Sequence, residues 1–186
     1  LKSQGMVYPC FCSRKEIERE LAEMAHAPQG PEGPLYPGIC RNISSADASE
    51  KMQQREPAWR LDSRKMDQNL SFHDRIHGTI AVDPNLLGDI VLARRDGFVA
   101  YHLAVVLDDA AQGITHVVRG QDLFEATRIH VVLQRLLGLP TPIYHHHRLI
   151  RDEAGKRLAK RDDARAIAKY REDGASPGAI RRLVGL

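Results

Sequence analysis

The chain has 186 residues, of which 42% are hydrophobic and 27% are charged, and its formal net charge is +3. This balance is typical of an ordinary soluble protein with enough residues for one substantial core or two small ones. No stretch approaches the ~20 apolar residues that a membrane-spanning helix needs, and no apolar segment near the N-terminus indicates a signal peptide. We therefore expect a cytoplasmic protein without a membrane partner. The charge permits a nucleic-acid partner but is too mild to indicate one.

The three cysteines all lie in the first 40 residues, at Cys10, Cys12 and Cys40. Their odd number argues against a disulfide framework. Tyr36 lies shortly before Cys40, and prolines and glycines around these residues indicate turns, where a thiol has little core to fill. Three sulfur ligands and one phenol oxygen suit a closed, structural zinc site. The alternative is that the cysteines are reduced and act as small buried hydrophobic residues.

The first half of the chain contains one clear helix signal followed by short strand signals. Ser13 and Glu16 form a capping-box pattern, which predicts a helix that runs to about His26. Residues 27–38 carry four prolines and three glycines, so we expect a loop there. Short strands are expected over residues 59–61, 78–82 and 89–93.

The second half alternates between strand and helix signals. The Asp-Gly pair at residues 96–97 predicts a hairpin that joins residues 90–93 to residues 98–101. The next predicted elements are a helix over 102–107 and a strand over 114–119. They are followed by a helix that begins with a capping box at Asp122 and Glu125 and ends at Gly138, and by a strand over 143–150. This alternation argues for a parallel α/β sheet.

Three features lie at predicted strand ends, where α/β folds bind their ligands. Tyr101 ends the predicted hairpin strand, and Arg119 leaves the next strand just before a helix. The planar fork of Arg119 suits a carboxylate ligand, although a surface pairing with Asp122 is an equal alternative. The third feature is the basic run over residues 155–161, which suits a polyphosphate but also resembles a solvated basic turn.

The histidines give weaker signals. Along a strand, His146 would point to the opposite face from His145 and His147, so we interpret this triplet as packing residues instead of a metal site. The spacing of His73 and His77 would put them on one helical face, but no third ligand lies near them in the sequence. We therefore expect these two to be structural.

The runs over residues 101–109, 113–122 and 155–161, in this order, resemble the second catalytic half of class I glutamyl-tRNA synthetases. The last run is similar to the KMSKS loop of that family, with Ala159 in place of its serine. The resemblance covers essentially the whole chain. It implies an α/β fold, the second half of a Rossmann-type nucleotide-binding domain with a zinc-binding α+β insertion. The implied domains are the insertion over 1–96, the catalytic half over 97–150, and the KMSKS-like loop with the start of a helical region over 151–186.

The resemblance also implies roles for individual residues. Tyr101 and Arg119 would bind glutamate, the latter through the side-chain carboxylate. Lys160 and Arg157 would be the catalytic residues of the signature loop, with Lys160 stabilising charge on the phosphates of ATP, which is used with Mg²⁺. The remaining implied ligands are Asp122 near the ATP ribose, Leu149 and Ile150 near the adenine, and Cys10, Cys12, Tyr36 and Cys40 at the zinc.

Within that family, the Cys-x-Cys and Tyr-x3-Cys pattern resembles the zinc site of a truncated paralogue. That paralogue activates L-glutamate with ATP and transfers it to the queuosine of tRNA(Asp), and we expect the same substrates for a monomeric parent protein. No His-x-Gly-His or His-x-Gly-Ser segment occurs, so the first ATP-binding half is missing and this chain alone should be inactive. The alternatives are a fragment of an ordinary glutamyl-tRNA synthetase and a non-catalytic, zinc-stabilised tRNA-binding module.

Overall fold

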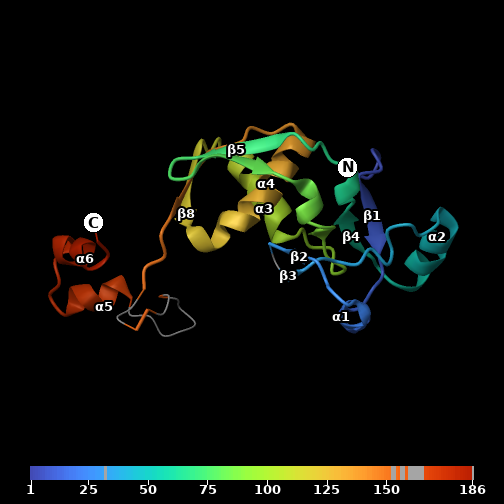
Figure 1. The fold of residues 1–186 in the computed structure, drawn as a ribbon, viewed down its shortest axis with the longest axis horizontal. Coiled ribbons are helices and arrows are strands. Elements are labelled where there is room, and N and C mark those ends of the chain that lie inside the picture. The colour runs from blue at the N-terminus through green and yellow to red at the C-terminus, as the bar shows by residue number, and fades with distance from the viewer. Residues whose placement is uncertain (32, 152–153, 156–157, 159–165, 186) are drawn as a thin grey trace.

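The computed structural model describes residues 1–31, 33–151, 154–155, 158 and 166–185, and Figure 1 shows an elongated molecule. One end is built on a three-stranded antiparallel sheet with the order β1-β4-β7. These strands are β1 (Val7–Cys10), β4 (Ala58–Leu61) and β7 (Val91–Ala93). Helices α1 (Arg14–Glu23) and α2 (Ser45–Gln54) lie at the same end (Figure 1).

The central body holds a four-stranded sheet with the order β6-β5-β9-β8. Its strands are β5 (Leu70–Asp74), β6 (Gly78–Val82), β8 (His116–Gly120) and β9 (Ile143–His147). The pairing of β9 with β8 and with β5 is parallel, whereas β5 pairs with β6 in antiparallel fashion. The expected α/β fold with a parallel sheet is therefore present. Strands from both sides of residue 96 share this sheet, and the domain boundary proposed there stays a prediction.

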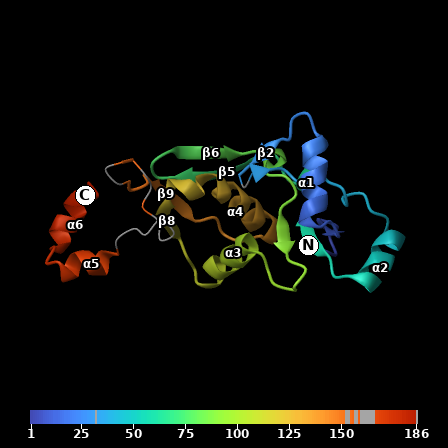
Figure 2. The same cartoon turned by 90° about the horizontal axis from the view of Figure 1, so that it is seen from below.

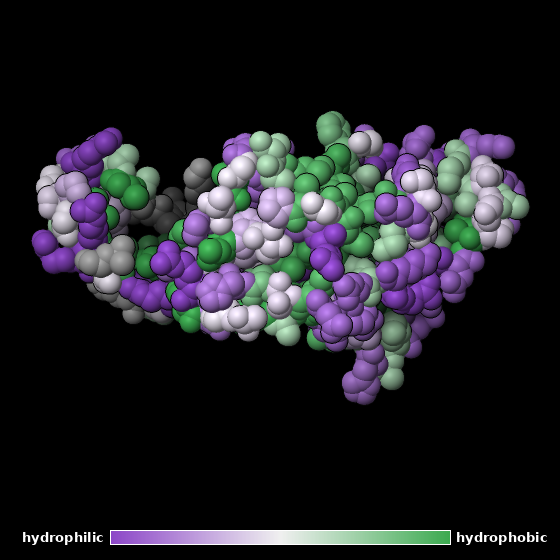
Figure 3. Space-filling view, turned by 90° about the horizontal axis from the view of Figure 1, so that it is seen from above, coloured by the Kyte–Doolittle hydropathy of each residue, from purple (hydrophilic) through white to green (hydrophobic). Residues whose placement is uncertain are grey.

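Two helices supply much of the apolar core. Helix α4 (Phe124–Leu137) packs against β5 and β6, and α3 (Tyr101–Ala111) packs against α4 and β7 (Figure 2). Ile129, Val132 and Leu133 of α4 are completely buried. The same core cluster includes Leu61 of the first sheet, so the two sheets share one hydrophobic core. Seen from above, hydrophobic side chains gather over the central body and hydrophilic ones over both ends (Figure 3).

The remaining elements are short. Helices α5 and α6 lie at the end of the molecule opposite to α1 and α2 (Figure 1). No helix within the described ranges is long and apolar enough to cross a bilayer. The short elements are β2 (Gln29–Gly30), β3 (Gly33–Pro34), the 3-10 turns η1 (Ser63–Lys65), η2 (Pro84–Leu86) and η3 (Gln121–Leu123), and helices α5 (Ile167–Glu172) and α6 (Pro177–Leu183).

The predicted helix boundaries are partly confirmed. The capping box of Ser13 and Glu16 is formed, and α1 ends three residues before His26. Gly138 ends α4 with a left-handed φ of 64°, as the sequence predicts. The second capping box is wrong, because Asp122 lies in the turn η3 and Leu123, which has no capping side chain, precedes α4.

The predicted hairpin turn at residues 96–97 is formed, since the amide of Arg94 donates to the carbonyl of Phe98, but its second strand is shorter than the predicted 98–101. Only Val99 forms an isolated bridge, to Ala93, and Tyr101 is the first residue of α3. The amide of Ala100 donates to the carbonyl of Leu92, and Ala100 then caps the helix, so the chain leaves the hairpin early. Strand β5 and helix α2 were not expected, and β9 ends at His147, three residues before the predicted end.

Asp89 joins three separate segments of the first end of the molecule. Its side chain is fully buried and accepts hydrogen bonds from the Tyr8 hydroxyl at 2.5 Å and from Arg41 Nε at 2.6 Å. Its other carboxylate oxygen accepts from the amide of Ser63 at 3.0 Å and from its hydroxyl at 2.9 Å. Each of these donors would be left without a partner if the carboxylate were removed.

Asp89→Ala should therefore lower the free energy of unfolding by about 3–5 kcal/mol, because it leaves buried donors and a half-buried arginine unpaired. Asp96→Ala is the matched control, since Asp96 pairs with Arg94 but its side chain is 41% exposed. That exposed pair should contribute less than about 1 kcal/mol. Urea unfolding of both variants measures the difference, and equal losses would contradict the assigned role of Asp89.

Candidate functional site

The three cysteines meet around the Tyr36 hydroxyl. Cys10 and Cys40 are buried, and the three sulfur atoms lie within 4.8 Å of one another. The Tyr36 oxygen is 3.4 Å from the sulfur of Cys10 and 3.3 Å from that of Cys12, and the sulfurs of Cys12 and Cys40 are 3.4 Å apart. The sequence prediction that these four side chains come together is thus confirmed.

The donor set fits a tetrahedral metal ion. With Zn–S bonds of about 2.3 Å, the sulfurs of a tetrahedral site lie about 3.8 Å apart, which is close to the observed spacing and far longer than a disulfide bond. Two backbone amides point at donor atoms, from Phe11 to the Cys40 sulfur at 3.4 Å and from Cys40 to the Tyr36 oxygen at 2.9 Å. Such amides stabilise negative charge on the ligands. The cluster can therefore hold a metal ion.

Charged neighbours support negative charge in this cluster. The hydrogen bond from Cys40 is the main cause that lowers the pKa of the Cys10 thiol, and the same bond raises the pKa of Cys40. The guanidinium of Arg60 lies 3.9 Å above the centre of the Tyr36 ring. Arg95 donates a hydrogen bond to the carbonyl of Cys12. These contacts favour at least one thiolate at a site that would otherwise be apolar.

Arg119 is the central cation of the second site. It stands at the end of β8, directly opposite His146 of β9 in the parallel register. Its Nε donates to His146 Nε2 at 3.1 Å, and its terminal nitrogens contact the Thr127 hydroxyl and His130 Nδ1, the latter at 3.4 Å. No described carboxylate forms an ion pair with it, so the pairing with Asp122 considered from the sequence is not formed. Burial lowers the pKa of Arg119.

A chain of histidines extends from Arg119 in two directions. His146 is fully buried, and its Nδ1 lies 2.6 Å from the carboxylate of Asp74, which has no exposed surface. On the other side, His130 Nε2 lies 3.0 Å from His102 Nδ1. Burial lowers the pKa of His130 to about 3, and burial also lowers that of His146. Both rings next to Arg119 are therefore neutral at physiological pH.

Tyr101 lies next to the same histidines. Its ring is 5.3 Å from that of His102 and 6.1 Å from that of His130, and 58% of the residue is exposed. The structure thus places both Tyr101 and Arg119 near His130, although it moves Tyr101 from the predicted strand to a helix.

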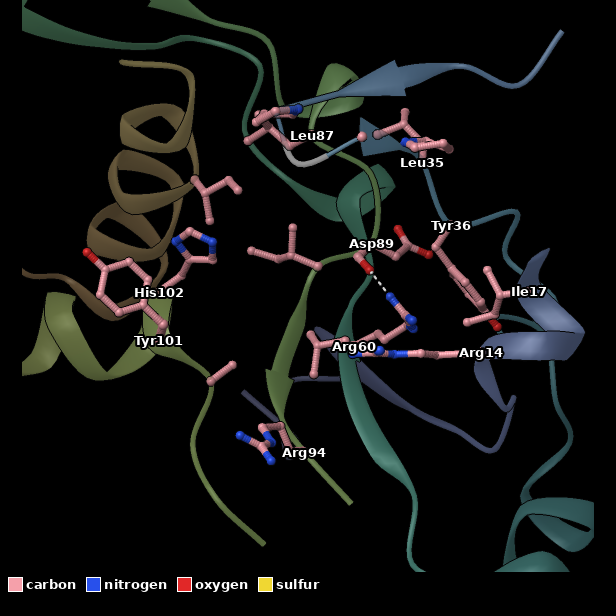
Figure 4. A pocket seen from close by; sticks show the side chains of 17 residues that line it. Arg14, Ile17, Leu35, Tyr36, Arg60, Leu87, Asp89, Arg94, Tyr101 and His102 are labelled. Carbon is pink, nitrogen blue, oxygen red and sulfur yellow. Dashed lines mark hydrogen bonds between the residues drawn. The ribbon is translucent and has the colours of Figure 1, made fainter. Parts of the chain in front are cut away.

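A cavity of about 670 Å³ opens between Tyr101 and the cysteine end of the molecule (Figure 4). Figure 4 shows Tyr101 and His102 on one side and Tyr36 with Arg14 on the other, with Arg60 between them. Arg60 is fixed by a hydrogen bond of 2.8 Å from Nη1 to the carbonyl of Asp89. The arginines give this cavity a basic lining that suits an anionic ligand. They are Arg14, Arg60 and Arg94.

The residues predicted for ATP binding surround Gly120. A Cβ atom at Gly120 would lie 2.5 Å from the carboxylate of Asp122 and 3.0 Å from the side chain of Leu149, so only glycine fits there without a shift. Ile150 lines a separate, mainly apolar cavity of about 690 Å³ together with Gln121. The structure therefore brings these predicted residues to one edge of the sheet. Lys160 and Arg157 lie outside the described residues.

Several residues of the second site were not predicted from the sequence. Asp74 lies in the unexpected strand β5, and Thr127 and His130 were assigned only to an amphipathic helix. Thr127 and His130 are marked by their burial, because both are polar, lie one helical turn apart and are at most 3% exposed. His146 was correctly placed on the face opposite to its neighbours, but its contact with Arg119 was not foreseen.

Comparison with known proteins gives a consistent result. The model of the family described as "tRNA synthetases class I (E and Q), catalytic domain" matches residues 1–186. The Glutamyl-Q tRNA(Asp) synthetase of Rhodobacter capsulatus is 53% identical over 100% of this chain and 69% of its own length. Those of Nocardia farcinica and Thiobacillus denitrificans are 43% and 46% identical, over 99% and 93% of this chain.

The chain spans 56% and 53% of the lengths of these last two relatives. Among solved structures, a glutamate tRNA ligase from Elizabethkingia meningosepticum in complex with its amino acid superposes with a TM-score of 0.74 at 26% identity. That alignment covers 97% of this chain and 41% of the ligase. The chain therefore belongs to the catalytic-domain family of the class I tRNA synthetases of the E and Q type.

Proposed function

We propose that the whole protein activates glutamate with ATP and transfers it to the queuosine of tRNA(Asp). The observation that carries this proposal is Arg119, a half-buried guanidinium whose described partners are all neutral. A desolvated cation without a carboxylate partner is costly unless a ligand supplies the anion. The relatives named Glutamyl-Q tRNA(Asp) synthetase support the choice of substrates.

Glutamate would bind with its side-chain carboxylate on Arg119. The guanidinium fork matches the two carboxylate oxygens, and partial exclusion of water strengthens the pair. Tyr101, whose ring lies 6.1 Å from that of His130, would line the same pocket and exclude water from it. These two residues position the amino acid and take no part in bond making.

ATP would bind at the edge of the sheet near Gly120. Asp122 suits a ribose hydroxyl, and Leu149 and Ile150 offer apolar surface to the adenine. In the first step, an oxygen of the glutamate α-carboxylate attacks the α-phosphorus, and the bond to the bridging oxygen of pyrophosphate breaks. Lys160 and Arg157 would stabilise the charge on the phosphates. In the second step, a hydroxyl of queuosine attacks the acyl carbon, loses its proton, and AMP leaves.

The cysteine cluster would hold structural zinc. Cys10, Cys12 and Cys40 supply three sulfur ligands and Tyr36 supplies the oxygen, which leaves no open position for a substrate. The ion would fasten β1 to the loop that carries Cys40 and so fix one wall of the basic cavity, to which Tyr36 also belongs. The tRNA backbone would pass along the arginines of that cavity.

Arg119→Ala in the full-length protein should raise the Michaelis constant for glutamate by a factor of ten or more, because truncation of one partner of a desolvated ion pair costs about 2–5 kcal/mol. The constant for ATP should change little. Glutamate-dependent pyrophosphate exchange measures both constants. Arg135→Ala is the control, since Arg135 is 66% exposed and belongs to the same helix as Thr127. An unchanged glutamate constant in Arg119→Ala would make Arg119 a structural residue.

The chain should contain about one zinc ion when it is purified without added metal. Structural zinc contributes on the order of 10 kcal/mol to small sites, so Cys10→Ser should lose most of the metal and Tyr36→Phe should bind it more weakly in competition with a chelator. Tyr170→Phe, at the other end of the molecule, is the control. Elemental analysis measures the zinc content of each of these proteins. Absence of zinc, with no uptake on titration, would favour the alternative of three reduced, buried cysteines.

The full-length protein should form glutamyl-adenylate without tRNA and should then charge tRNA(Asp) only when queuosine is present. A single-stranded anticodon base can be splayed into a protein pocket and read there. Transfer of labelled glutamate to tRNA(Asp) with and without queuosine, beside tRNA(Glu), measures the specificity. Label on the 3′ end of tRNA(Glu) would favour an ordinary glutamyl-tRNA synthetase. Failure to form the adenylate would favour a non-catalytic tRNA-binding module.

A further inference from the structure

The proposed function needs Arg119 but does not explain how its guanidinium is held. Its contacts come from two other elements, because His146 lies on β9 and Thr127 and His130 lie on α4, whereas Arg119 itself lies on β8. Asp74 reaches the group from a fourth element, β5. These polar residues are buried although they lie outside the proposed substrate site. Each of them must have its hydrogen bonds satisfied.

The directions of these hydrogen bonds are fixed by chemistry. A guanidinium can only donate, so His146 Nε2, which receives a hydrogen bond from Arg119 Nε, must be unprotonated. A neutral His146 therefore carries its proton on Nδ1 and donates it to Asp74 across 2.6 Å. The backbone amide of His146 donates to the same Asp74 oxygen at 3.1 Å. Asp74 thus selects the tautomer of His146 that can accept from Arg119.

The second histidine, His130, has the opposite tautomer. His130 Nδ1 faces the terminal nitrogens of Arg119 and must accept from them. Its proton is therefore on Nε2 and points to His102 Nδ1 at 3.0 Å. His146 and His130 flank one guanidinium as opposite tautomers. Both are acceptors on the side that faces Arg119.

Asp74 also places a negative charge behind His146 without occupying the arginine. Burial raises the pKa of Asp74, but hydrogen bonds from the His146 ring and from the amides of His77, Ile76 and His146 outweigh it and lower the pKa to about 2. The carboxylate is therefore ionised, one imidazole away from Arg119. The guanidinium has five N–H groups and meets only three described acceptor atoms, so N–H groups are left over for a ligand.

We propose that Asp74, His146 and His130 are positioning residues that orient Arg119 through two opposite imidazole tautomers and leave its free N–H groups to the substrate carboxylate. This proposal rests on the proposed function, since the ligand is taken to be glutamate. A carboxylate in direct contact would occupy the N–H groups of Arg119, whereas the neutral histidines hold the guanidinium and leave its charge available.

The tautomers can be read directly in the 186-residue chain. Long-range ¹⁵N–¹H spectra of histidine-labelled protein at neutral pH distinguish protonation at Nδ1 from protonation at Nε2. We expect His146 to be neutral with the proton on Nδ1 and His130 to be neutral with the proton on Nε2. A doubly protonated His146, or one with the proton on Nε2, overturns the proposal.

Variants of the full-length protein test the consequence for binding. Asp74→Asn removes the charge and presents N–H groups to His146, and His146→Leu removes the acceptor for Arg119. Each should raise the Michaelis constant for glutamate about tenfold or more and change that for ATP less than about twofold, since a hydrogen bond to a charged group is lost. His146→Gln places an amide oxygen where it can accept from Arg119 and should recover most of the loss. His145→Gln, on the opposite face of β9, is the matched control.

The outcomes separate the two proposals. Equal changes in the glutamate and ATP constants, or a His146→Gln variant no better than His146→Leu, would give these residues a merely structural role and overturn the positioning proposal alone. A wild-type protein whose pyrophosphate exchange does not depend on glutamate would overturn the proposed function, and the assignment of the substrate carboxylate would fall with it. The tautomer spectra are independent of that result.

Discussion

A guanidinium held by neutral partners is the constraint on which the central body of this molecule depends. Arg119 is partly desolvated, and its contacts are two imidazole nitrogens and one hydroxyl. A cation in this setting calls for an anion, which a ligand carboxylate would supply, while Asp74 fixes the ring of His146 that contacts the guanidinium. The arrangement keeps the cation available, and it explains why strands and helices distant in the sequence must meet at this point.

The sheet order follows from the same requirement. Strand β9 lies between β8, which carries Arg119, and β5, which carries Asp74, so the intervening His146 can touch both. Parallel pairing of β8 and β9 puts Arg119 and His146 in register. Helix α4 closes the site from the side with Thr127 and His130, both of them buried. Precise placement of a binding group by rigid elements and a supporting shell is what a specific site requires.

The two ends of the molecule are connected through a shared core and through the basic cavity. Tyr36 belongs both to the cysteine cluster and to the wall of the cavity, and Tyr101 lies at its far side (Figure 4). A metal ion at the cysteines would therefore shape a cavity that Tyr101 of the proposed glutamate site also lines. Asp89 joins the segments of Tyr8, Arg41 and Ser63 by hydrogen bonds and so holds the part of the molecule between Tyr36 and Tyr101 in place.

The sequence predicted what local chemistry determines. The capping box at Ser13 and the left-handed Gly138 follow from residue types at short range, and the meeting of Tyr36 with the cysteines follows from their shared ligand chemistry. The set of residues around Arg119 could not be predicted in this way, because Asp74 and His146 are 72 residues apart and come together only through the parallel pairing of β5 and β9.

The start of α3 at Tyr101 was missed for a related reason. Asp-Gly predicts a hairpin, but the second strand ends after one bridge, at Val99, because the backbone of Ala100 turns to cap the helix. The Asp-Gly turn itself is formed, with Gly97 at a φ of 83°, and only the strand after it is cut short. Likewise, Thr127 and His130 belong to a helix whose pattern is apolar, and only the fold shows that their polar atoms face a cation.

A crystal structure of the full-length protein with glutamate and a non-hydrolysable ATP analogue tests the central claim most directly. The account predicts the side-chain carboxylate within about 3 Å of the terminal nitrogens of Arg119, with His146 and His130 still in contact with the guanidinium. A glutamate whose carboxylate is bound elsewhere, or an Arg119 that leaves its histidines to form an ion pair with a protein carboxylate, would contradict it.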